Sequence, residues 1–135
     1  GKKAKPPKEL PPLEFKSSDG YTILVGRNNI QNDKLSMKLS NNNDMWLHTQ
    51  KVPGSHVIIK NIDGKVSDLS IEEASSIAAY YSKARESSLV EVDYTNVRHL
   101  KKPVGAKPGK VIYHEYSSLI AKPDKALVDK LFVKK

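Results

Sequence analysis

Apolar residues recur along the chain in short runs that predict β-strands. Segment 89–95 alternates between apolar and polar positions, which is the pattern of a strand with one buried face. Further strands are predicted over 21–25, 45–50, 56–62, 111–113 and 118–120. The turn sequence Val52-Pro53-Gly54-Ser55 separates the second and third of these runs, so the two are expected to form a hairpin.

Helical spacing of apolar residues is clearest from Ser70 to about Glu86. Ser70 and Glu73 have the spacing of a capping box, in which each side chain satisfies the other residue's backbone N–H. The apolar residues that follow form one stripe: Ala74, Ile77, Ala78 and Tyr81.

A second helix is expected to begin after Asn28 or Asn29, because asparagine is a favoured N-cap. Its periodicity puts Ile30, Lys34 and Met37 on one face, with two leucines close by.

The order of these elements is strand, helix, hairpin, helix and several strands, followed by a short helix over 124–131. It predicts an α+β fold with a mainly antiparallel sheet and two principal helices. The chain of 135 residues suits one domain. Residues 1–16 are predicted to be a basic linker rich in lysine and proline, and residues 17–135 the folded domain.

Composition removes several functional classes. Cysteine is absent, which excludes a disulfide scaffold and a cysteine-based zinc site or nucleophile. None of the four histidines has the helical spacing of a zinc protease, so neither a metal nor another cofactor is expected. The absence of cysteine also fits a reducing cytoplasm, which is the expected location. No apolar run reaches membrane-spanning length, so no membrane insertion is expected.

Positive charge is concentrated at the two ends of the chain. Of the net charge of +8, residues 1–16 carry +3, residues 17–94 carry −2 and residues 95–135 carry +7. Basic clusters attract polyanions through steering and counterion release, although surplus lysine also serves solubility. The distribution therefore favours a nucleic-acid partner.

The first candidate motif is VGRNNIQND at 25–33. A helix N-terminus after a glycine turn offers free N–H groups to a phosphate. Arg27 can add a bidentate contact, and Asn28, Asn29 and Asn32 carry donors and acceptors for sugar or base edges. Asparagine caps and glycine turns are also ordinary structural features, so both interpretations stay open.

The second motif joins DMWLH at 44–48 to PGSH at 53–56. His48 and His56 have flat rings of the kind that stack on single-stranded bases, and Ser55 follows a glycine that a ligand can approach closely. The alternative is that the histidines are hydrogen-bonded sheet residues. For Trp46 a place in the core is the favoured interpretation.

The third motif is a basic Gly/Pro loop, KKPVGAKPGK at 101–110, preceded by Arg98. Such a loop can follow a phosphate backbone without reading sequence. It is not a P-loop, because no Ser or Thr follows its last lysine. The alternative is a solvated loop. Candidate phosphate contacts here are Arg98, Lys101, Lys102 and Lys107.

These three blocks together resemble the NFACT-R domain, the C-terminal RNA-binding domain of the bacterial RqcH and FbpA-type fibronectin-binding protein family. The matching stretches run in the family's order over about residues 20–123. They are YTILVGRNNIQND, DMWLHTQKVPGSHVIIK, SIAAYYSKARES and VEVDYTNVRHLKKPVGAKPGKVIYHEY.

The resemblance implies an RNA-binding module that catalyses nothing itself. Its family binds the obstructed large ribosomal subunit and recruits alanyl-tRNA for template-free alanine tailing of stalled nascent chains. The implied partners are tRNA, the large ribosomal subunit, and the N-terminal and coiled-coil parts of a longer chain. The family's motifs would place RNA contacts at Arg27, Asn28, Asn29, Asn32, His48, Ser55, His56, Arg98, Lys101, Lys102 and Lys107.

Two alternatives remain at this point. Family members are also described as fibronectin-binding adhesins that reach the cell surface without a signal peptide, which makes a protein-interaction domain the second hypothesis. A small nuclease with His56 or His99 as general base is the third, although no spacing singles out a catalytic group.

Overall fold

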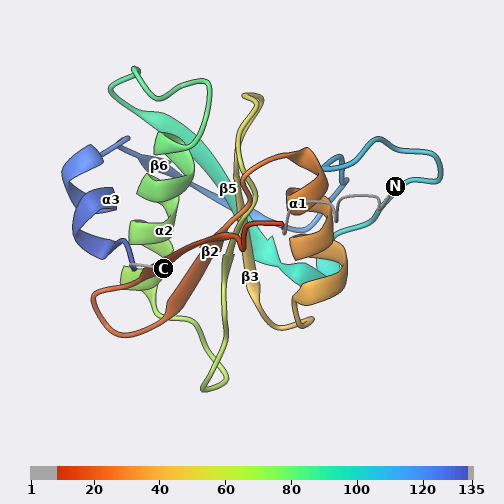
Figure 1. Ribbon diagram of the computed structural model, residues 1–135, viewed down its shortest axis with the longest axis horizontal. Helices are drawn as coiled ribbons and strands as arrows, with labels where there is room; N and C mark the ends of the chain where they lie inside the picture. The colour runs from red at the N-terminus through yellow and green to blue at the C-terminus, as the bar shows by residue number, and fades with distance from the viewer. Residues whose placement is uncertain (1–8, 134–135) are drawn as a thin grey trace, which may run out of the picture.

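The computed structural model describes residues 9–133, and its centre is a six-stranded antiparallel sheet (Figure 1). The strands lie in the order β1-β2-β4-β3-β5-β6. Their bounds are β1 (Leu13–Lys16), β2 (Thr22–Val25), β3 (Met45–Thr49), β4 (Val57–Ile59), β5 (Val90–Asn96) and β6 (Ser117–Ala121). The predicted hairpin is confirmed, since β3 and β4 pair antiparallel with Trp46 opposite Ile58.

Helices cover both faces of the sheet. Figure 1 shows α2 (Asp68–Tyr80) and α3 (Lys125–Leu131) on one side, and α1 (Asn29–Lys34) on the other. α1 runs on into a wider π-helical turn, η1 (Leu35–Leu39), and a 3₁₀ turn, η2 (Val97–His99), follows β5. The predicted α+β class is therefore confirmed, with α3 as a third helix.

Alternation along the strands divides the interior into two clusters. On β3, Leu47 belongs to the large core under α2 and α3, whereas Trp46 points to the α1 face. Trp46, Ile58 of β4 and Leu24 of β2 are register neighbours, so they form one row on that face. His48 lies two residues beyond Trp46, and the pleat therefore puts both rings on the α1 side.

The predicted linker ends too late. Residues 13–16 form β1, which pairs with β2, and Phe15 of this strand is completely buried. Phe15 packs edge-on against Phe132 at 5.4 Å, so the start and end of the folded region meet. The proline-rich composition of this segment suggested a linker, although its last four residues form a strand. The folded unit therefore begins before residue 17. Residues 1–8 of the predicted linker lie outside the described residues.

The predicted start of the long helix is also wrong. Ser67 is the N-cap of α2, and its Oγ accepts a hydrogen bond from the Ser70 N–H. Glu73 does not take part in capping and instead accepts from the backbone and hydroxyl of Ser18 at 2.7 and 2.5 Å. The helix ends at Tyr80, because the following residues turn to meet the loop after β3.

In α1 the cap is as predicted, since Asn28 Oδ1 accepts from the Gln31 N–H at 2.9 Å. The buried face differs from the predicted one. Gln31 and Asn32 are buried, and the side chain of Ile30 is 64% exposed. Polar groups of the preceding loop need partners here, so hydrogen bonding decides the orientation over apolar periodicity.

Candidate nucleic-acid interface

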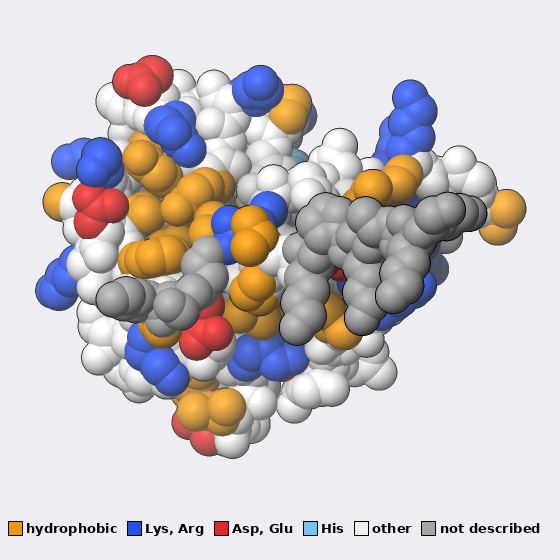
Figure 2. Space-filling view, viewed as in Figure 1, with side chains coloured by type: hydrophobic (Ala, Val, Ile, Leu, Met, Phe, Trp, Pro, Cys, Tyr) orange, Lys and Arg blue, Asp and Glu red, His pale blue; other side chains and the backbone are white. Residues whose placement is uncertain are grey.

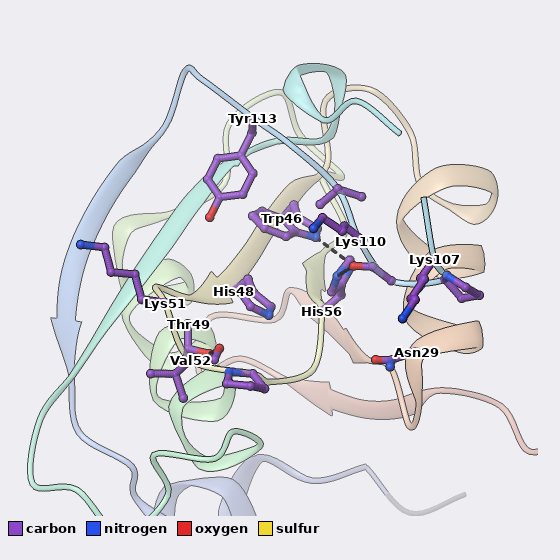
Figure 3. A pocket seen from close by; sticks show the side chains of 14 residues that line it. Asn29, Trp46, His48, Thr49, Lys51, Val52, His56, Lys107, Lys110 and Tyr113 are labelled. Carbon is purple, nitrogen blue, oxygen red and sulfur yellow. Dashed lines mark hydrogen bonds between the residues drawn. The ribbon is translucent and has the colours of Figure 1, made fainter. Parts of the chain in front are cut away.

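A cavity of about 700 Å³ opens on the α1 face of the sheet (Figure 3). The last four residues of the basic loop (residues 101–110) form one wall, and the first three residues of the turn after β3 (residues 51–55) form another. The floor consists of side chains from β3 and of His56. We call this cavity the aromatic cleft; its lining includes Asn29, Trp46, His48, His56, Lys107 and Tyr113.

Aromatic rings form the inner wall of the cleft. His48 stacks on Trp46 with ring centroids 5.7 Å apart and an interplanar angle of 10°, and Tyr113 meets Trp46 edge-on at 4.9 Å. Trp46 is 1% exposed, so its predicted place in the core is confirmed. Tyr113 and His48 are only half-buried. Their faces are therefore the ones that a flat ligand can reach.

The ring of His56 is held entirely by the protein. Its Nε2 lies 2.9 Å from the carbonyl oxygen of Gly109, which can only accept, so this nitrogen carries the proton. Nδ1 then accepts from the Ser36 hydroxyl at 2.7 Å and from the Trp46 indole N–H at 3.1 Å. Burial lowers the pKa of His56 to about 4, aided by nearby His48. The neutral ring thus joins the basic loop to the sheet.

Asp33 provides a second attachment for the basic loop. Its Oδ1 accepts from the Gly109 N–H at 3.0 Å and pairs with the Lys102 ammonium at 2.6 Å. Burial raises the pKa of Asp33, but the bonds from Lys102 and Gly109 outweigh it and hold that pKa below its usual value. Lys102 also donates to the carbonyl oxygens of Lys107 and Lys110. Lys102 therefore acts as a clip: its ammonium holds the basic loop to Asp33 and already has three acceptors within the protein.

Replacing Lys102 with methionine is expected to loosen the basic loop. The substitution keeps the apolar stem and removes the donor that Asp33 and two carbonyl groups share. Losing these charge-assisted bonds costs about 1–3 kcal/mol locally. Hydrogen exchange at the Gly109 amide should accelerate accordingly. Lys101→Met is the matched control because this neighbour is exposed; equal acceleration in both variants would contradict the clip.

Unpaired cations, more than total charge, locate a polyanion site. Figure 2 shows Lys and Arg side chains around much of the outline of the molecule. Within residues 9–133, Lys51, Lys107 and Lys110 have no ion-pair partner, and all three line the aromatic cleft. Arg98 and Lys101 are also exposed, but they do not line this cleft.

A second hollow, of about 480 Å³, lies beyond the turn after β3. Arg27 lines it from the end of β2, Ser55 from the turn, and Lys83 and Arg85 from the segment after α2. We call it the cationic hollow. Asn28 also lines it but is engaged as the helix cap. Asn29 and Pro53 line both cavities, so the two are neighbours.

The structure divides the predicted RNA contacts into three groups. Asn29, His48 and Lys107 border the aromatic cleft with free or half-exposed groups, and Arg27, Asn28 and Ser55 border the cationic hollow. Asn32 and His56 are buried and bonded to each other, since Asn32 Oδ1 accepts from the His56 N–H at 3.1 Å. The remaining three, Arg98, Lys101 and Lys102, line neither cavity.

The cavity residues that were not selected as RNA contacts from sequence include Lys51, Lys83, Arg85, Lys110 and Tyr113. Lys51 could have been found from sequence, because it directly precedes the Val52-Pro53-Gly54 turn. Its backbone adopts a left-handed φ of 58°. Lys83 and Arg85 fall within the YSKAR stretch that was expected to be helical. Among residues 9–133 no cluster of three acidic, His or Cys side chains could hold a metal.

The sequence comparisons identify the family of this chain. A family model described as "NFACT protein RNA binding domain" matches residues 12–115. The chain belongs to the NFACT RNA-binding domain family. Two curated relatives carry the name Rqc2 homolog RqcH. That of Bacillus subtilis (strain 168) is 49% identical over 131 residues, and that of Streptococcus suis (strain 05ZYH33) is 44% identical over 118 residues.

Coverage is unequal in these comparisons. The alignments take in 96% and 86% of this chain but 22% and 21% of the two relatives, so the chain spans about a fifth of their length. A solved structure, the C-terminal part of the fibronectin/fibrinogen-binding protein from Streptococcus suis, matches with a TM-score of 0.91 and 38% identity. That match covers 96% of this chain and 52% of the other. Membership in the NFACT family supports an RNA-binding role.

No helix within the described NFACT domain is both long and apolar enough to cross a membrane.

Proposed function

We propose that this NFACT domain binds a single-stranded segment of tRNA or ribosomal RNA in the aromatic cleft. The observation that carries the proposal is the pairing of half-exposed rings, Tyr113 and His48, with the unpaired cations Lys51, Lys107 and Lys110 on one cavity. Aromatic platforms stack on bases of any sequence, and lysines follow the phosphates.

The cleft is built for binding and not for catalysis. His56, the general base that the sequence suggested, has both ring nitrogens engaged and a pKa of about 4, so it is a poor general base or acid near neutral pH. Within a longer chain of the RqcH type, the domain would contribute affinity for tRNA and for the large ribosomal subunit in the cytoplasm. The parent factor would thereby recruit alanyl-tRNA for alanine tailing of stalled nascent chains.

A salt series tests the proposal. Binding of purified tRNA should weaken steeply with salt, and a Lys107→Gln/Lys110→Gln variant should bind less tightly. The slope of log Kobs against log salt should flatten by about 0.7 for each single-strand phosphate that the variant no longer neutralises. The control is Lys38→Gln/Lys65→Gln, which removes two exposed charges that line neither cavity. Equal slopes in the two variants would show that the basic loop is not part of the RNA site.

Fibronectin binding is the second candidate, supported by the likeness to the streptococcal fibronectin/fibrinogen-binding protein. It predicts saturable capture of purified fibronectin that survives nuclease treatment and moderate salt. Capture that disappears with nuclease would show a nucleic-acid bridge instead of a protein contact.

A further inference from the structure

The proposed binding of RNA in the aromatic cleft assigns no role to the cationic hollow. Arg27, Lys83 and Arg85 come from two distant parts of the chain and line one space. Its lining contains asparagine and serine side chains and no carboxylate. None of the three cations has an ion-pair partner within residues 9–133. Such a concentration of unpaired positive charge is suited to an anion.

The backbone holds the walls of the hollow firmly together. The Ser55 N–H donates to the Tyr81 carbonyl at 3.0 Å, and the Lys83 N–H donates to the Pro53 carbonyl at 2.9 Å. Between these two bonds Gly54 forms a bridge with Ser82. A Cβ at Gly54 would lie 2.9 Å from Thr49 Oγ1 and 3.0 Å from the Ser82 Cβ. The glycine therefore lets the turn after β3 lie against the segment after α2.

The side chains of both arginines are oriented by the protein. Arg27 Nε donates to the Pro11 carbonyl at 2.6 Å, whereas its Nη2 is buried and has no hydrogen-bond partner among the described residues. Arg85 Nε donates to the Tyr80 carbonyl at 2.7 Å, and its guanidinium lies 4.1 Å from the centre of the Tyr80 ring. Each guanidinium is thus held in place at the hollow, and guanidinium groups bind phosphate oxygens through charge-assisted hydrogen bonds.

We propose that the cationic hollow binds a phosphate group of the same RNA strand whose base occupies the aromatic cleft. The inference rests on the proposed function and extends it. The two cavities share Asn29 and Pro53, so a strand leaving the cleft reaches the hollow by crossing these residues. Arg27, Lys83 and Arg85 then contact a phosphate adjacent to the bound nucleotide, which gives the strand a defined path over the domain.

The first test measures binding of dodecauridylate across a salt series. Lys83→Gln/Arg85→Gln should weaken binding about tenfold, which corresponds to the loss of one charge-assisted hydrogen bond. It should also flatten the salt slope by about 0.7 for each phosphate left without its cation. Lys38→Gln/Lys65→Gln is again the control with equal loss of charge. Lys83 and Arg85 are exposed, so their replacement leaves the core intact.

The second test is independent of RNA. Pyrophosphate is titrated into the isotope-labelled domain, and backbone amide signals report the site. The amide signals of Ser55 and of residue 83 should shift in the wild type and in Lys107→Gln/Lys110→Gln, and stay unmoved in Lys83→Gln/Arg85→Gln.

The outcomes separate the two ideas. If dodecauridylate binding depends on Lys107 and Lys110 and is unchanged in the Lys83/Arg85 variant, the hollow plays no part and the proposed function stands. If the reverse holds and pyrophosphate moves Ser55, the hollow is a phosphate site and the aromatic cleft is not the RNA site. Pyrophosphate shifts that persist in the Lys83/Arg85 variant would overturn the assignment of these two cations.

Discussion

Replacing Gly26 with alanine is expected to lower the free energy of unfolding by about 3 kcal/mol. A Cβ at this position would lie 1.8 Å from the Oδ1 atom of Asn32 and 2.9 Å from its Cγ. Asn32 cannot simply move away, because it is 3% exposed and its Oδ1 accepts the His56 N–H. Overpacking typically costs about 1–3 kcal/mol, and an unsatisfied buried N–H costs a similar amount.

The consequence extends to the cleft, because His56 would lose one of its anchors. Chemical denaturation of the wild type and Gly26→Ala measures the loss in stability. A double-mutant cycle with Asn32→Ala identifies the cause: truncating the side chain makes room for the new methyl group, so the two losses should be less than additive. Simple additivity, or a loss below about 1 kcal/mol for Gly26→Ala, would contradict the steric account.

Acidification below pH 6.5 is expected to destabilise the domain through His56. His56 has a pKa of about 4 in the folded state, below the value near 6.5 that an unfolded histidine shows. The unfolded state therefore binds a proton first as the pH falls, and stability decreases from pH 6.5 down to pH 4. The difference between the folded and unfolded pKa values of His56 corresponds to about 3 kcal/mol of unfolding free energy. Burial lowers the pKa of His48 as well, which adds a contribution of the same sign.

Trp46 supplies the measurement, because it is the only tryptophan and its indole N–H bonds directly to His56. Protonation of His56 Nδ1 removes the acceptor that Trp46 and Ser36 share. Denaturation followed by Trp fluorescence should thus show a falling midpoint between pH 6.5 and pH 4. His56→Gln, which does not titrate, should flatten this dependence. An unchanged pH profile in the variant would assign the effect to other groups.

Most strand positions and the fold class could be predicted from sequence because they depend on local alternation. Two strand predictions failed: β1 was missed, and the strand expected over 111–113 is only an isolated bridge between Ile112 and Lys101. The pattern in 89–95 identified β5, and Trp46 was correctly expected in the core. Helix ends depended on which hydroxyl reaches which N–H. Ser67 and Ser70 both have the right chemistry, and only the packing of Ser70 against Ser17 and Asp19 makes Ser67 the cap.

The site was predictable in composition but not in detail. Sequence alone identified the basic loop and the histidines, yet not that Lys102 is occupied by Asp33 or that Asn32 and His56 bond to each other. These partners are distant in sequence, and only the fold brings them together. The cationic hollow was missed for the same reason, since only the fold brings Arg27 and Arg85 to the lining of one cavity.

Photo-cross-linking tests the central claim most directly. RNA containing 4-thiouridine is bound to the domain, irradiated and digested, and the modified peptides are identified by mass spectrometry. Cross-links should fall on Tyr113, His48 and the basic loop near Lys107, because these groups border the aromatic cleft. Cross-links confined to α2 and α3, on the opposite face of the sheet, would contradict the assignment of the RNA site to the cleft.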